Sequence, residues 1–118
     1  MRERPEPPYV VVAGDRSSPL LRAALAGLEE EGVPGRVVTL PSPAALLDEL
    51  SDALAAARWA AARSPLEVGL AITADAACLT HAKFAAGHAI EHLRSPRPGD
   101  VRRLGHNAAR VVCCVPLR

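Results

Sequence analysis

Three short apolar runs alternate with segments of helical periodicity, and this alternation constrains the fold of the 118-residue chain more than any other feature. The runs cover residues 9–13, 36–40 and 67–73. Continuous apolar runs of this length are typical of strands buried on both faces of a parallel sheet. Strands that alternate with helices place those helices on the faces of the sheet. The pattern therefore predicts an α/β domain.

The helical segments have recognisable ends. A serine before Pro19 can cap the first helix, and Gly32 is a natural C-terminal stop. The second helix is expected over residues 44–62, where leucines and alanines follow the spacing of a buried stripe. A third helix is expected over residues 101–112, and we expect the proline-rich residues 94–100 before it to form a loop.

The connection after the third apolar run is too short for a parallel crossover. Only residues 74–76 separate this run from a further expected strand at 77–83, which implies an antiparallel pair. Residues 87–93 fit either a last strand or a helical turn. We therefore predict a three-layer sandwich with a mostly parallel sheet of four or five strands, helices on both faces and one antiparallel strand pair. Residues 1–8 are expected to form a flexible tail and residues 9–118 a single α/β domain.

Composition argues against several classes of function. The net charge is +1 and aromatic residues make up 3%, so neither a nucleic-acid footprint nor a base-stacking platform is indicated. We find no signal peptide and no apolar run long enough to span a membrane. The three cysteines are too few and too irregular for a disulfide framework, which favours a reducing compartment. We expect a cytoplasmic protein that binds neither nucleic acid nor membrane.

No motif in the sequence identifies a catalytic centre. The turn at residues 14–18 lacks the glycine pattern of a nucleotide-binding loop, and an ordinary capped turn explains it. His88 and His92 could share a helix face as metal ligands do, but a third ligand at a recognisable spacing is missing. Cys113 and Cys114 do not lie at a helix N-terminus, where a thiolate would be favoured. We therefore expect a protein that docks on a larger partner and carries out no catalysis.

One sequence feature breaks a local rule. Glu29, Glu30 and Glu31 occupy the last turn of the first expected helix, where the helix dipole already places partial negative charge. Such a run can offer carboxylate oxygens to a hard cation such as Mg²⁺, which often shares its ligands with a partner. The alternative is a solvated acidic helix end paired with Arg22 or Arg36.

Three stretches together carry a resemblance to a known family. They are GLEEEGVP at residues 27–34, ARSPLEVGLA at residues 62–71, and GHNAAR at residues 105–110 followed by Val115-Pro116. In order and spacing they resemble the small subunit of the reactivating factor for coenzyme B12-dependent diol and glycerol dehydratases. A His-x-Lys step at His81–Lys83 is similar as well.

This resemblance implies a fold like that of the dehydratase medium subunit and a non-catalytic role. The small subunit would pair, as a heterotetramer, with a large chaperone-like ATPase subunit. It would exchange with subunits of the inactivated dehydratase, so that damaged cobalamin leaves. The family places a glutamate on a Mg²⁺ at the interface of the two subunits, and the matching residue is Glu30, with Glu29 and Glu31 as weaker candidates. The isolated chain would bind no cofactor, and ADP or ATP would bind only the large subunit.

Two features depart from the family and two other functions stay open. Cys113-Cys114 stands where the family often has Lys-Gly, and residues 94–100 carry more arginine and proline than expected. One alternative is a medium-type structural subunit of a B12-dependent dehydratase, although those subunits usually have a longer N-terminal extension. The other is a nucleotide-binding domain on a flavodoxin-like scaffold. A role in propanediol utilization and association with a bacterial microcompartment are also open under this resemblance.

Overall fold

Five strands form one mixed sheet in the computed structural model, which describes residues 7–39, 53–84 and 88–114. β1 (Val10–Ala13) lies parallel between β2 (Gly35–Val38) and β3 (Val68–Ile72), β4 (Ala76–His81) is antiparallel to β3, and β5 (Glu91–Arg94) is antiparallel to β4. The strand order is β2-β1-β3-β4-β5. Four strands thus run in one direction and β4 runs in the other, so the sheet is mostly parallel as predicted.

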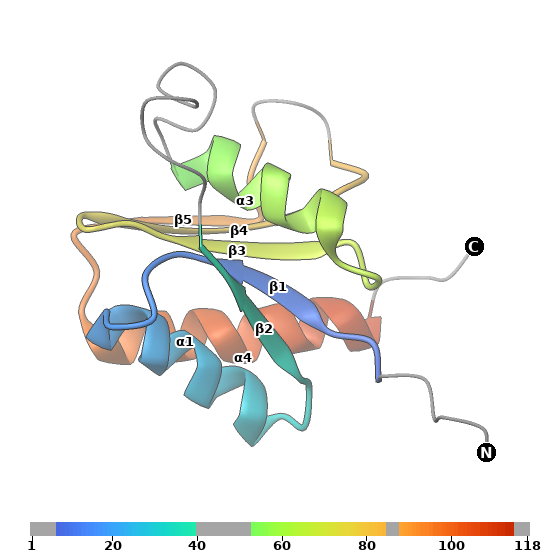
Figure 1. The fold of residues 1–118 in the computed structure, drawn as a ribbon, viewed down its shortest axis with the longest axis horizontal. Helices are drawn as coiled ribbons and strands as arrows, with labels where there is room; N and C mark the ends of the chain where they lie inside the picture. The colour runs from blue at the N-terminus through green and yellow to red at the C-terminus, as the bar shows by residue number, and fades with distance from the viewer. Residues whose placement is uncertain (1–6, 40–52, 85–87, 115–118) are drawn as a thin grey trace.

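Helices cover both faces of this sheet (Figure 1). α1 (Pro19–Glu30) and α4 (Pro98–Cys114) lie side by side on one face, and α3 (Ala53–Arg63) lies on the other. The three-layer α/β sandwich is confirmed, and so is the antiparallel β3–β4 pair, to which β5 adds a second one. Among the described residues, no helix is long and apolar enough to cross a membrane.

The first helix begins and ends as the sequence predicts. The Ser18 hydroxyl accepts a hydrogen bond from the Leu21 amide at 3.3 Å, and Pro19 follows it in the first turn. At the other end Gly32 has φ +79°, and the Val33 amide donates to the Leu28 carbonyl at 3.0 Å. Both ends therefore satisfy main-chain groups that the helix leaves without partners.

The last helix begins earlier than the sequence analysis expected, so the proposed loop over residues 94–100 is wrong in its second half. α4 begins at Pro98, where a missing amide hydrogen costs nothing because the first turn has no acceptor for it. The Asp100 carboxylate accepts from the Arg97 amide at 3.0 Å, and the Arg97 carbonyl accepts from the Asp100 amide at 3.0 Å. This reciprocal cap starts the helix at a proline that otherwise indicates a break.

The uncertain segment at residues 87–93 ends in a strand, because β5 pairs with β4 over residues 91–94. The other differences are small: each remaining element begins or ends within two residues of its expected bound where both are described. Part of the predicted second helix, residues 44–52, lies outside the described residues, as do residues 1–6 of the predicted tail. Pro7 and Pro8 are exposed and belong to no helix or strand.

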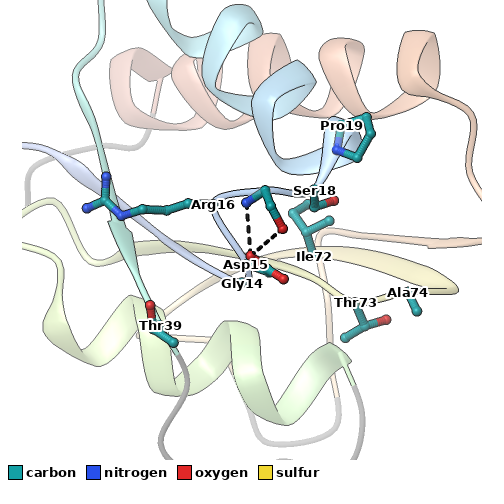
Figure 2. Close-up of a pocket in the computed structure, with 10 residues that line it drawn as sticks. Gly14, Asp15, Arg16, Ser18, Pro19, Thr39, Ile72, Thr73 and Ala74 are labelled. Carbon is teal, nitrogen blue, oxygen red and sulfur yellow. Dashed lines mark hydrogen bonds between the residues drawn. The ribbon is translucent and has the colours of Figure 1, made fainter.

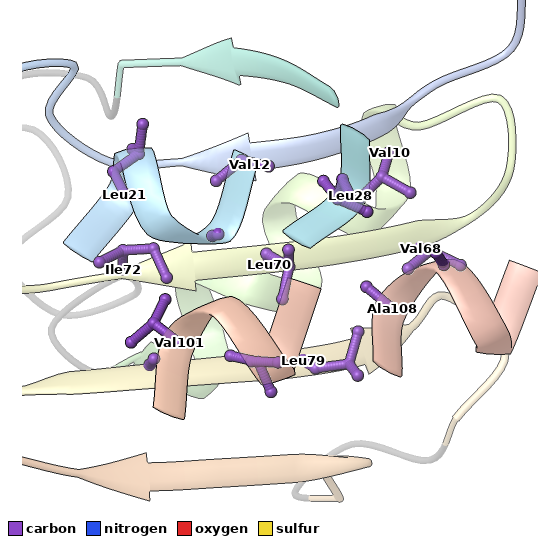
Figure 3. Packing of buried hydrophobic residues seen from close by; sticks show 14 of the residues in the cluster. Val10, Val12, Leu21, Leu28, Val68, Leu70, Ile72, Leu79, Val101 and Ala108 are labelled. Atoms are coloured by element: carbon purple, nitrogen blue, oxygen red, sulfur yellow. The ribbon is translucent and has the colours of Figure 1, made fainter. Parts of the chain in front are cut away.

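The larger apolar side chains gather between the sheet and the α1–α4 pair (Figure 3). Leu21 and Leu28 from α1 and Leu104 from α4 are fully buried there against the valines and leucines of β1, β3 and β4. Aliphatic side chains therefore fill this part of the core, in a chain of which aromatic residues make up only 3%.

The opposite face is packed with small side chains. Ala53, Ala56, Ala57 and Ala60 of α3 are buried against the sheet. A Cβ on Gly69 of β3 would overlap main-chain atoms of α3. The helix therefore lies directly on the strand, and position 69 has no room for a side chain.

α1 and α4 cross at two glycines. A Cβ on Gly27 would overlap the carbonyl oxygen of Arg102, and a Cβ on Gly105 would overlap that of Ala24. Main-chain contact at this point brings the side chains on either side of the crossing within reach of the facing helix. The end of α1 thus meets the middle of α4.

Gly105→Ala should lower the free energy of unfolding by about 1–3 kcal/mol or more, because the two helix backbones must separate. Gly99→Ala is the matched control in the same helix, since a Cβ there meets no atom within 4 Å. It should leave stability unchanged or raise it by up to about 1 kcal/mol. Urea denaturation measures both, and equal stability of the two variants would contradict the close crossing.

Candidate functional site

The acidic run lies at the C-terminal end of α1. The helix ends at Glu30, and Glu31 forms its C-cap, with its amide donating to the Leu28 carbonyl at 3.1 Å. Last-turn carbonyl groups carry partial negative charge, so these carboxylates need positive partners from elsewhere in the fold.

α4 supplies those partners across the helix crossing. Arg102 forms a two-pronged ion pair with Glu30, in which Nε donates to Oε1 at 2.9 Å and Nη2 donates to Oε2. His106 lies one turn further along, with Nε2 at 2.7 Å from Oε1 of Glu30 and Nδ1 at 2.6 Å from Oε2 of Glu31. We call Glu30, Glu31, Arg102 and His106 the carboxylate cluster.

The carboxylate cluster determines how many hydrogen bonds the His106 ring must donate. Each ring nitrogen faces a carboxylate oxygen, and a carboxylate can only accept a hydrogen bond. A neutral imidazole carries one N–H, so the ring satisfies both glutamates only when both nitrogens are protonated. In that state the two positive groups of α4 balance the two negative groups of α1.

The sequence analysis named the wrong partners for the acidic run. Arg22 donates instead to the Ser17 carbonyl at 3.4 Å, and Arg36 donates to the Tyr9 hydroxyl at 3.1 Å and stacks on its ring. The true partners lie more than 70 residues away in the chain. His106 was visible within the GHNAAR stretch, but its role depends on which helix crosses α4 at this point, and that is a long-range fact.

Glu30 fits the chemistry of one ligand in a shared cation site. Its carboxylate is the hard oxygen donor that Mg²⁺ prefers, and its side chain keeps 36% of its surface exposed. Among the described residues, no group of three or more His, Cys, Asp or Glu is arranged to hold a metal ion. The remaining ligands would have to come from water or from a second protein, as Mg²⁺ commonly allows.

A separate hollow lies at the carboxyl ends of β1 and β3 (Figure 2). Its volume is about 980 Å³, and its walls include the 14–19 turn, Thr39 and residues 72–74. The polar groups of the turn already bond to one another: the Asp15 carboxylate accepts from the Ser17 amide at 2.9 Å and from its hydroxyl at 2.8 Å. The turn is therefore the ordinary capped turn that the sequence indicated.

The other candidate residues do not assemble into a site. His88 lies outside any helix or strand and His92 lies on β5, so they do not share a helix face. Cys113 and Cys114 fall at the end of α4, where the structure describes only the backbone. No serine or threonine hydroxyl of the described residues is hydrogen-bonded to a histidine ring, and so none forms a nucleophile–base pair there.

His81–Lys83, the predicted His-x-Lys step, lies at the end of β4. The Lys83 amide donates to Nδ1 of His81 at 3.1 Å, so this nitrogen is unprotonated and the proton of a neutral ring is on Nε2. Nε2 and the Lys83 ammonium each lie 3.9 Å from the Glu67 carboxylate. This arrangement ties the end of β4 to the start of β3.

Comparison with known proteins assigns the fold and its family. The model of the dehydratase medium subunit family matches residues 7–118, and the chain therefore belongs to this family. A solved structure of diol dehydratase-reactivating factor complexed with ADP and Mg²⁺ is 30% identical with a TM-score of 0.76, over 96% of this chain and 99% of that chain. A glycerol dehydratase reactivase is 32% identical with a TM-score of 0.77, over 95% and 97% of the two chains. Comparison with curated proteins gives no match.

Ser17→Ala should move the pKa of Asp15 upward. The Ser17 amide and then its hydroxyl stabilise the charged carboxylate and hold its pKa below the ordinary value of 3.8. The variant keeps the amide and loses the hydroxyl, so carbon-detected NMR titration should find a partial return toward 3.8. Because the folded pKa is depressed, the stability linked to it is present above the unfolded pKa and is lost as the pH falls through the folded one. An unchanged pKa would contradict the hydroxyl contact.

Proposed function

We propose that this protein is the small subunit of a factor that reactivates a coenzyme B12-dependent diol or glycerol dehydratase. The observation that carries the proposal is the likeness to two reactivase structures over nearly the whole of both chains. A domain shared with a much longer protein would match only part of it, whereas here 99% and 97% of the matched chains are covered. The matching chains are therefore counterparts of the whole chain.

The proposed role is docking and exchange without catalysis. The small subunit pairs with a large, chaperone-like ATPase subunit in a heterotetramer, and resembles the dehydratase medium subunit closely enough to take its place. Subunit exchange then opens the inactivated dehydratase, and damaged cobalamin leaves. ATP and ADP bind the large subunit, and the whole cycle takes place in the cytoplasm. Membership of the dehydratase medium subunit family supports this exchange, because the two subunits share a fold.

The proposed contact with the large subunit includes a Mg²⁺ ion held on this side by Glu30. Three features support the choice: the carboxylate is partly exposed, it lies at a helix end rich in negative charge, and the related reactivating factor was solved with ADP and Mg²⁺. The ion supplies a positive charge that both subunits can share. Glu29 is exposed and Glu31 faces His106, so both remain weaker candidates.

Glu30→Gln should weaken the complex with the large subunit by about tenfold or more, because a neutral amide replaces the charged ligand. Glu29→Gln is the matched control, since it removes the same charge from the adjacent exposed position. Interferometry with the immobilised large subunit, with Mg²⁺ or EDTA, measures both affinities. Equal losses in the two variants would contradict a specific role for Glu30, and no binding of the unaltered chain would reject the proposed partnership.

A functional assay separates this proposal from the medium-subunit alternative. Added together with the large subunit, ATP, Mg²⁺ and fresh coenzyme, the chain should restore activity to dehydratase that its substrate has inactivated. Neither subunit alone should do so. Assembly of this chain into an active, cobalamin-binding dehydratase would instead establish the medium-subunit function.

A further inference from the structure

The Glu30 carboxylate, which is proposed to bind the metal ion, already forms an ion pair with Arg102 of the same chain. Both lone-pair directions of the Glu30 Oε1 atom are used, one by Nε of Arg102 at 2.9 Å and one by Nε2 of His106 at 2.7 Å. Oε2 accepts from the second prong of the same guanidinium. A carboxylate has about four acceptor positions, so three of them are filled.

A divalent ion on the fourth position would lie beside the Arg102 guanidinium. Two positive groups on one carboxylate repel each other, and the repulsion is greater for a doubly charged ion. The guanidinium on Glu30 therefore weakens the binding of a metal ion to the same carboxylate.

The Arg102 side chain is placed so that it can move away from Glu30. Its side chain keeps 55% of its surface exposed and Glu30 keeps 36%, so the pair is open to water. Exposed ion pairs contribute little to stability, because water replaces the lost contact at low cost. The close crossing at Gly105 fixes the backbone of α4, so the arginine side chain can swing away without movement of the helix.

We propose that Arg102 is an internal cation that competes with Mg²⁺ for Glu30 and gives way to it when the large subunit docks. In the free chain Arg102 neutralises Glu30 and lowers the affinity of this carboxylate for metal. In the complex Mg²⁺ binds the Glu30 carboxylate in place of Arg102, and the released guanidinium faces the partner. The inference rests on the proposed function, because it assigns Glu30 to the shared metal site.

Arg102→Met tests the competition, because methionine keeps an apolar stem and removes the charge and the fork. Arg103→Met is the matched control: it removes the same charge from the next position of α4, where the exposed side chain makes no ion pair with any described residue. The full chain is titrated with Mg²⁺ in the presence of the large subunit, and assembly is followed by interferometry. Melting temperatures that lie within about 3 °C of the unaltered chain establish that both variants fold.

Arg102→Met should lower the Mg²⁺ concentration for half-maximal assembly by about three- to tenfold, and Arg103→Met should leave it unchanged. A higher Mg²⁺ requirement in Arg102→Met would overturn the proposal and make Arg102 a residue that positions Glu30 for the ion. Equal effects of the two variants would show that only the net charge of the chain matters, and this outcome would also overturn the proposal.

Glu30→Gln distinguishes this failure from failure of the proposed function. If Glu30→Gln abolishes the Mg²⁺ dependence while Arg102→Met changes nothing, the competition is wrong and the metal bridge stands. If the unaltered chain assembles equally well in EDTA, or does not assemble, then the metal bridge or the partnership fails and the competition fails with it.

Discussion

The contact between the backbones of α1 and α4 is the constraint on which the rest of this face depends. Gly27 and Gly105 remove the side chains that would hold the helices apart. Only at this distance do Arg102 and His106 reach the glutamates at the end of α1. The same contact closes the core beneath it, where Leu28 and Leu104 are fully buried. Packing and surface electrostatics on this face thus share one cause.

Most of the fold could be predicted because its signals are local. Apolar runs identified the buried strands, Ser18 and Gly32 marked the ends of α1, and the short turn before β4 required an antiparallel pair. The start of α4 was missed because a proline can break a helix or begin one. Which of these occurs at Pro98 depends on the reciprocal cap between Arg97 and Asp100, and that cap is geometric.

Of the carboxylate cluster, only the glutamates at the end of α1 could be predicted from the sequence. Three carboxylates at the negative end of a helix dipole are visible in the sequence as a local conflict, which indicated either a cation site or pairing with a nearby arginine. The identity of the positive partner is a long-range fact, since β2, α3, β3, β4 and β5 all lie between Glu30 and Arg102 in the chain. Pairing with a nearby arginine was the reasonable local expectation, and the helix crossing overrode it.

The two faces of the sheet are packed differently, and the intrinsic fluorescence of the chain's tryptophan reports on only one of them. Trp59 is the chain's single tryptophan, and it lies on α3 beneath the Arg63 guanidinium, on the face of the sheet opposite α1 and α4. Its emission therefore responds to the alanine-packed layer and is separated from the carboxylate cluster by the whole sheet. A change in emission when a partner binds would show that the disturbance reaches the α3 face, whereas unchanged emission would confine it to the α1–α4 face.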